Sequence, residues 1–155
     1  IVVPGNHERG VQSNEALFRQ MCKYDNVICL IHERVVIEGI KFFGTPYHPI
    51  FFNWAYNKTE DELRALYEQI PSDIHFLITH CPPNGILDYS PLCGNVGSQL
   101  LLERVREISP KFHAFGHIHF SHGLVEANGT TFINGAILTD QYKLNNKMIV
   151  VDFQQ

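Results

Sequence analysis

The stretch Ile74-His75-Phe76-Leu77-Ile78-Thr79-His80-Cys81-Pro82-Pro83 decides the fold of this chain. The part up to Thr79 is rich in β-branched and aromatic residues, which favour a buried strand. The two prolines cannot continue a hydrogen-bonded ladder, so the chain must turn there. The stretch therefore predicts a strand that delivers His80 to its carboxyl end.

The same arrangement, an apolar run followed by a polar turn, occurs twice more. Residues 1–3 end a buried strand before Gly5-Asn6-His7-Glu8, and residues 112–115 form a short strand before Gly116-His117-Ile118-His119. In an open α/β sheet, ligands bind beyond the carboxyl ends of the strands. If the strands are parallel, we expect the Asn and His side chains of the three turns to lie together at one edge of the sheet.

Helices and hairpins are predicted between and after these strands. Three segments have helical signals: a helix from Ser13 or Asn14 to about Tyr24, one opened by the capping box Thr59-x-x-Glu62, and residues 97–108. Residues 27–32 and 35–44 favour a hairpin or adjacent strands, Asn128-Gly129 favours a two-residue hairpin, and residues 147–153 favour a final strand. The pattern predicts an α/β fold with a mixed sheet, in a single domain over residues 1–155.

Composition narrows the possible functions. The chain has 155 residues, of which 45% are hydrophobic and 18% charged, with a formal net charge of -4. These values are typical of a folded domain. No basic stripe is present, which argues against a general nucleic-acid surface, and no stretch approaches the roughly 20 apolar residues of a membrane helix. An anionic substrate would have to be held by a local positive centre such as a metal ion.

The cysteines and the first residues bear on the compartment. Cys22, Cys29, Cys81 and Cys93 form no C-x-x-C pair, which argues against a zinc ribbon or a thioredoxin-like site. We expect reduced, mostly buried thiols and a cytoplasmic protein, since no signal peptide is recognisable. The chain opens on Ile1 rather than Met, which suggests processing or an incomplete sequence.

A long aromatic loop over residues 45–57 allows two interpretations. Its aromatic side chains can cover the site and stack on a base, or they can pack as a second small core. Trp54 is expected to be at least partly buried in either case. His48 is a weaker candidate for contact with the substrate, whereas His75 and His113 lie within strands and are expected to be structural.

The residue types in the three turns suit a metal site. Imidazole nitrogens bind zinc, iron and related ions, and an amide oxygen suits harder cations. His117 and His119, two residues apart, face a single ion less easily than two adjacent ions. Gly116 is expected to let the backbone approach closely.

With these residues the chain resembles the calcineurin-like metallophosphoesterases over its whole length. Gly5-Asn6-His7-Glu8, Thr79-His80 and Gly116-His117-Ile118-His119 are similar, in this order, to the last three sequence blocks of that superfamily. Phe43-Gly44-Thr45-Pro46 and Thr79-His80-Cys81-Pro82-Pro83 resemble its MPPED branch, which hydrolyses phosphodiesters, including 2′,3′-cyclic nucleotides. The resemblance implies the C-terminal part of a β-sandwich flanked by helices.

The resemblance also implies a role for each residue. Asn6, His80 and His117 would ligate one divalent ion and His119 a second, the ions being manganese, iron, zinc or magnesium. His7 would lie beside the scissile phosphate and protonate the leaving oxygen, with Glu8 orienting it. The reaction implied is hydrolysis of a phosphodiester or phosphomonoester, in a small molecule or a nucleotide, by hydroxide that the metals activate.

The sequence departs from the family in one large respect. The Asp-x-His and Gly-Asp blocks, which supply the bridging carboxylate, do not occur in these residues. We therefore expect a domain that is incomplete at its N-terminus, binds at most one metal weakly and has little or no activity alone. Two alternatives remain: an inactive binding module with this fold, and a zinc site that uses Cys81 with His80. Opposite orientation of adjacent strand residues argues against the second.

Overall fold

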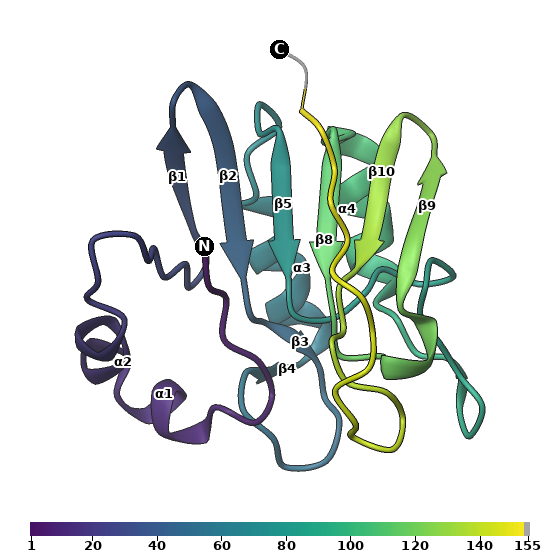
Figure 1. Ribbon diagram of the computed structural model, residues 1–155. Helices are drawn as coiled ribbons and strands as arrows, with labels where there is room; N and C mark the ends of the chain where they lie inside the picture. The colour runs from purple at the N-terminus through teal and green to yellow at the C-terminus, as the bar shows by residue number, and fades with distance from the viewer. Residues whose placement is uncertain (154–155) are drawn as a thin grey trace.

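Six strands form a mixed sheet at the centre of the molecule. The computed structural model describes residues 1–153 (Figure 1). Four strands run parallel in the centre, and an antiparallel strand borders them on each side. In spatial order they are β1 (Glu33–Ile37), β2 (Ile40–Thr45), β5 (Phe76–Thr79), β8 (Phe112–Phe115), β10 (Thr130–Asn134) and β9 (Gly123–Ala127). The predicted α/β class with a mixed sheet is confirmed.

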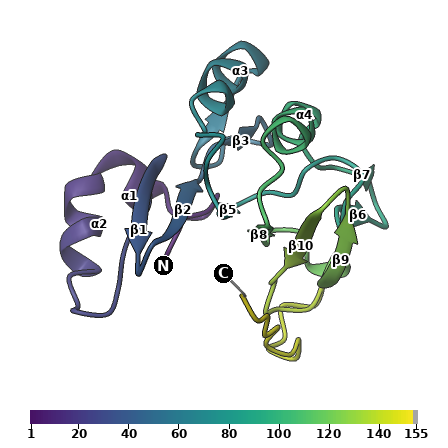
Figure 2. The same cartoon turned by 90° about the horizontal axis from the view of Figure 1, so that it is seen from above.

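Two helices cover one face of the sheet (Figure 2). They are α3 (Glu60–Glu68) and α4 (Gln99–Ile108). Thr59 and Glu62 form the predicted capping box, and the Ser98 side chain caps α4 by accepting from the Leu101 N–H. Between the helices and the sheet lies the main core, formed by Phe43, Leu63, Tyr67, Ile70, Ile74, Leu77, Leu101, Val105, Ile108, Phe115 and Phe132.

The other face of the sheet carries a row of phenylalanines. Phe76 of β5 stacks between Phe42 of β2 at 4.8 Å and Phe112 of β8 at 4.6 Å. The C-terminal segment runs over this face and packs Phe153 against Phe76 (Figure 1). The predicted final strand over residues 147–153 is wrong, because this segment packs across the face of the sheet and pairs with none of its strands. Residues 1–153 do not form the second large sheet of a sandwich.

The β1–β2 hairpin lies later in the chain than predicted. Both of its strands fall within residues 33–45, whereas residues 27–32 contribute only an isolated bridge from Cys29 to Val2. Glu38 and Gly39 form the turn, with φ values of 50° and 81°. Positive φ at both central positions is what a tight two-residue hairpin needs. The second hairpin, β9–β10, is confirmed around Asn128-Gly129.

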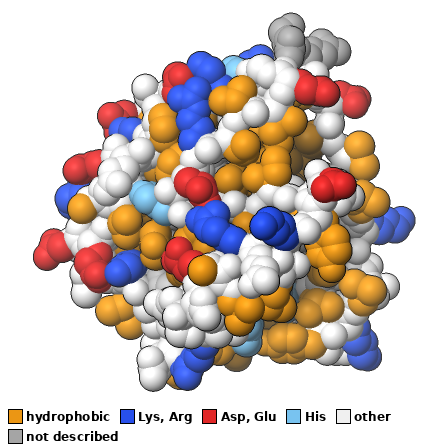
Figure 3. Space-filling model, turned by 90° about the vertical axis from the view of Figure 1, so that its left-hand side faces the viewer, with side chains coloured by type: hydrophobic (Ala, Val, Ile, Leu, Met, Phe, Trp, Pro, Cys, Tyr) orange, Lys and Arg blue, Asp and Glu red, His pale blue; other side chains and the backbone are white. Residues whose placement is uncertain are grey.

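The N-terminal segment packs at one side of this sheet. It contains α1 (Arg9–Ser13), which the sequence analysis did not predict, and α2 (Glu15–Met21), capped by Asn14 and shorter than predicted. Neither helix has a buried residue. Leu17 and Met21 are exposed, and Figure 3 shows the hydrophobic side chains of this face scattered among charged ones.

The remaining elements are short connections. They are β3 (His48–Pro49), β4 (Asn57–Lys58), β6 (Tyr89–Ser90), β7 (Gly94–Asn95) and the 3-10 helix η1 (His119–Ser121). None of the helices within residues 1–153 combines the length and the apolar character that crossing a bilayer requires.

Candidate metal centre

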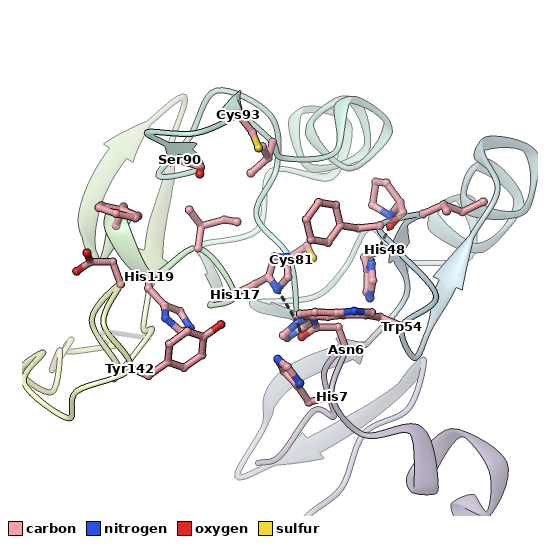
Figure 4. Close-up of a pocket in the computed structure, with 18 residues that line it drawn as sticks. Asn6, His7, His48, Trp54, Cys81, Ser90, Cys93, His117, His119 and Tyr142 are labelled. Carbon is pink, nitrogen blue, oxygen red and sulfur yellow. Dashed lines mark hydrogen bonds between the residues drawn. The ribbon is translucent and has the colours of Figure 1, made fainter.

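Asn6, His80 and His117 meet at the carboxyl end of the parallel strands (Figure 4). His80 Nε2 lies 2.9 Å from Asn6 Oδ1 and 3.1 Å from His117 Nδ1. His80 follows β5 and His117 lies two residues beyond β8, its parallel neighbour. The Gly116 N–H donates to the His80 carbonyl, which fixes the two turns relative to each other. The three turns therefore converge as the sequence predicts.

The three atoms are spaced as ligands of one cation would be. Nitrogen and oxygen ligands at about 2.1 Å from an ion, at right angles, are about 3.0 Å apart. Burial, with His117, His48 and His7 nearby, lowers the pKa of His80 to about 2. Burial, with His48, His119 and His7 nearby, lowers the pKa of His117 to about 4. Both rings are therefore neutral near pH 7, which is the form that binds a metal. The donor set fits a divalent ion.

Gly5 makes room for the His80 ring. A Cβ at this position would lie 2.5 Å from His80 Cε1, so no other residue fits without a shift. The expectation that Gly116 allows the close approach is wrong, because a Cβ there would meet nothing nearer than 4.0 Å. His117 itself takes a strained backbone, with φ of 67°. Such strain persists where the surroundings enforce it, often at functional sites.

His119 differs from the other pocket histidines in the hydrogen bond that sets its tautomer. Its Nδ1 lies 3.0 Å from the Thr139 carbonyl, which can only accept, so Nδ1 carries the proton. Nε2 is then left with its lone pair free. Metal-binding histidines commonly donate their other ring N–H to a backbone carbonyl in this way. His119 lines the same pocket as the other three residues and has the tautomer that its predicted role needs.

His7 is exposed, and its ring packs against Trp54 with the ring centroids 4.4 Å apart. The Glu8 carboxylate accepts a hydrogen bond from the Gly5 N–H at 2.6 Å. Glu8 therefore shapes the turn that carries Asn6 and His7, and Trp54 supplies the contact that orients the His7 ring.

Cys81 is closer to the centre than strand geometry suggests. Its sulfur and ring nitrogens of His80 and His117 lie within 4.8 Å of one another. The expected opposite orientation of His80 and Cys81 is wrong, because β5 ends at Thr79 and the alternation of strand residues ends with it. Burial raises the pKa of the Cys81 thiol well above its ordinary range. A neutral thiol is a poor ligand, so Cys81 would have to lose its proton to join the set.

A pocket of about 400 Å³ opens beside these residues. The loop at residues 45–57 contributes to the pocket and to a core. Phe51 and Trp54 line the pocket, whereas Tyr47 and Tyr56 belong to a second small core with Ile31 and Ala55. Trp54 is half-buried, as expected. The full lining is Asn6, His7, His48, Pro49, Ile50, Phe51, Trp54, His80, Cys81, Ser90, Cys93, Val96, His117, Ile118, His119, Phe120, Asp140 and Tyr142.

His48 lies in the pocket wall, but its nitrogens face the backbone. Nδ1 lies 2.9 Å from the Pro49 carbonyl and Nε2 lies 2.9 Å from the Ala55 carbonyl. The side chain is 1% exposed, and burial lowers its pKa despite these two contacts. His48 therefore holds the aromatic loop in place and offers no ring nitrogen to a substrate. His113 is buried, as expected for a structural residue, and His75 accepts the Lys41 N–H.

Six lining residues were not predicted from the sequence: Ser90, Cys93, Val96, Phe120, Asp140 and Tyr142. Asp140 and Tyr142 lie in a turn between Thr139 and Lys143, a region for which no element was predicted. Turn residues lack the periodicity that marks helices and strands. The only available clue was an aromatic and an acidic residue soon after β10. The expectation of mostly buried thiols is also wrong, because only Cys81 is buried.

Comparison with known proteins identifies the family. No family model matches the chain. Metallophosphoesterase domain-containing protein 1 of Homo sapiens is 36% identical over 130 residues, which cover 82% of this chain and 40% of the human protein. The chain belongs to the metallophosphoesterases. UPF0046 protein K07C11.7 of Caenorhabditis elegans is 34% identical over 167 residues, covering 97% of this chain and 56% of that protein.

Two solved structures share the fold of this chain. One crystal structure has a TM-score of 0.68 at 17% identity and covers 87% of this chain and 56% of its own. TT1561 of Thermus thermophilus has a TM-score of 0.51 at 14% identity, with 86% of this chain and 61% of its own covered. At these identities the likeness concerns the fold alone. This metallophosphoesterase chain spans about half the length, or less, of the curated relatives named above.

Proposed function

We propose that this metallophosphoesterase hydrolyses phosphodiesters, in small molecules or nucleotides. The observation that carries the proposal is the convergence of Asn6 Oδ1, His80 Nε2 and His117 Nδ1 beside a 400 Å³ pocket. These three residues would hold one divalent ion, and the free Nε2 of His119 would hold a second. When bound, such ions neutralise phosphoryl oxygens and activate water.

The pocket lining favours a diester over a monoester. The pocket is lined by apolar and aromatic side chains that include Ile50, Phe51, Trp54, Phe120 and Tyr142. No Lys or Arg occurs among the described residues that line it. A monoester carries a charge near -2 and would bring it to a wall without a cationic side chain. A diester carries a single charge and a second organic group, which suits apolar walls.

His7 is proposed as the residue that protonates the leaving oxygen. Its exposed ring lies against Trp54 and lines the pocket next to Asn6. General acid catalysis of this kind typically contributes about 10²–10⁴-fold. In the full-length protein, His7→Ala should therefore lower kcat on an aryl phosphodiester by about 10²–10⁴-fold, measured by release of the phenol. An unchanged kcat would remove His7 from this role.

The proposed activity is tested with bis(4-nitrophenyl) phosphate and added Mn²⁺ or Zn²⁺. The full-length protein should release 4-nitrophenolate. His80→Ala should lower the rate of release by at least about 100-fold, because it removes a metal ligand. His75→Ala is the matched control, because His75 precedes β5 and makes its contact with Lys41. We expect it to keep most of the activity.

The alternative, an inactive binding module, makes a different forecast for the same assay. Such a protein would bind the metal ion in a titration yet release no 4-nitrophenolate from any phosphate ester. Assaying the 155-residue chain in parallel tests whether these residues suffice for activity. We propose that they do not, because their metal donors are neutral and two adjacent dications need an anionic bridge.

A further inference from the structure

The loop between β10 and the C-terminal segment is a fixed structure. Leu138 and Leu144 form an isolated antiparallel bridge, and within it the Thr139 N–H donates to the Lys143 carbonyl at 2.9 Å. The Asn146 side chain donates to the Ala136 carbonyl at 2.8 Å and to the Leu138 carbonyl at 3.1 Å. We call residues 138–144 the rim loop. Its hydrogen bonds hold its side chains in defined positions at the pocket.

Tyr142 occupies the strained position of the rim loop. Its φ is 56°, in the left-handed region that a bulky residue rarely adopts. The side chain is nevertheless 67% exposed, so burial in a core does not account for its placement. Its ring lies edge-on to His119 with the centroids 5.1 Å apart, and its hydroxyl points toward the pocket (Figure 4).

Trp54 stands on the other side of the pocket. In Figure 4, His117 lies between Trp54 and Tyr142, and Asn6 lies beside Trp54. His7 packs on Trp54, so a leaving oxygen protonated by His7 lies on the Trp54 side. The ester group that stays on phosphorus occupies another corner of the phosphate, and Tyr142 of the rim loop lines the same pocket.

We propose that Tyr142 forms the wall against which the retained ester group packs, and that it selects flat aromatic groups over small alkyl groups. The proposal rests on the proposed function and adds a specificity-determining residue to it. One aromatic contact of this kind changes affinity by about three- to tenfold. The proposal assigns the preference to the aromatic ring of Tyr142 rather than to its hydroxyl.

Two substrates with the same leaving group test the wall. 4-Nitrophenyl phenyl phosphate and 4-nitrophenyl methyl phosphate differ only in the retained ester group. In the full-length protein, kcat/KM should be higher for the phenyl ester than for the methyl ester. Tyr142→Ala should reduce the ratio of the two kcat/KM values by about three- to tenfold. Tyr142→Phe should keep it. Leu144→Ala, an exposed change in the same loop, is the matched control and should leave the preference unchanged.

A merely structural role for Tyr142 gives a different result. If its ring only steadies His119, then Tyr142→Ala lowers kcat/KM for both substrates equally, and the proposed wall is overturned. Tyr142→Leu keeps bulk beside His119 without a flat ring. It should lose the preference while retaining more activity than Tyr142→Ala on the methyl ester.

A binding measurement makes the test independent of catalysis. Trp54 is the only tryptophan in the sequence and lines the pocket, so its fluorescence reports on occupancy. In the presence of Zn²⁺, phenylphosphonate should bind about three- to tenfold more tightly than methylphosphonate, and Tyr142→Ala should erase the difference. Equal binding in the unaltered protein overturns the wall. A binding preference without hydrolysis would leave the wall standing and reject only the proposed activity.

Discussion

The two halves of the metal centre rest on very different supports. His80 and His117 follow β5 and β8, two central parallel strands between a helical layer and a row of phenylalanines. Asn6 and His7 lie on a segment whose two helices bury no residue. That segment is attached through Val2, which exchanges backbone hydrogen bonds with Ile28 and Leu30, and through the Asn6 carbonyl, which accepts from the Ala55 N–H. Local opening is cheapest where few apolar contacts are buried, so the Asn6 half should open first.

The largest expected effect comes from the sheet core. Leu77 of β5 is 0% exposed, so Leu77→Ala should lower the free energy of unfolding by about 2–5 kcal/mol through lost burial and a cavity. Leu17 of α2 is 48% exposed, and Leu17→Ala should change it by no more than about 0.5 kcal/mol. Urea denaturation of both variants measures the contrast. Equal costs would mean that the N-terminal segment is packed as firmly as the sheet.

The second effect concerns the contact between the two halves. Gly5→Ala would place a Cβ 2.5 Å from the His80 ring, and such overpacking costs about 1–3 kcal/mol. Because the His80 ring must move, we also expect the Zn²⁺ affinity of the Gly5→Ala variant to fall by at least about tenfold, measured by titration.

Gly10→Ala is the matched control for this change. A Cβ at Gly10 meets nothing within 4 Å, and alanine favours the α1 helix. This variant should bind Zn²⁺ as the unaltered protein does. A similar loss of affinity in both variants would mean that the N-terminal segment, rather than the fit of His80, is responsible.

The third effect is acid sensitivity within the sheet. His113 of β8 is buried, and burial lowers its pKa from 6.5 to about 3. The unfolded chain therefore takes up a proton below pH 6.5 that the folded chain refuses. Stability is complete above that pH and falls by up to about 1.4 kcal/mol per pH unit as the pH drops toward 3.

A variant isolates the contribution of His113 from that of the other buried histidines. In His113→Gln, the metal-free free energy of unfolding should fall less steeply between pH 6.5 and 4.5 than in the unaltered protein. Urea titrations at several pH values give the two slopes. Identical slopes would mean that His113 takes up a proton in the folded state.

The sequence predicted the sheet half of the site better than the other half. The runs ending at Thr79 and Phe115 are apolar, and the Cys81-Pro82-Pro83 turn stops the first of them, so the positions of His80 and His117 followed from local signals. The capping box at Thr59 and the Asn128-Gly129 hairpin are equally local and were also confirmed.

What could not be predicted depends on contacts between distant residues. The role of Gly5 follows from its approach to a ring 75 positions later in the chain, and the place of Cys81 depends on where β5 ends. Residues 147–153 have the composition of a strand, but they pack across the face of the sheet instead of pairing at its edge, and local sequence does not encode that choice. The rim loop gave no pattern at all, although it brings Tyr142 to the pocket.

The contact between Asn6 and His80 joins positions separated by 74 residues. A cation held there would act as a cross-link that closes a long loop of chain, and closing such a loop restricts the unfolded ensemble more than the folded one. Anything that binds the folded state alone also shifts the folding equilibrium toward it. Metal supply would then govern more than chemistry: it would set how much of the time the N-terminal segment is docked at all.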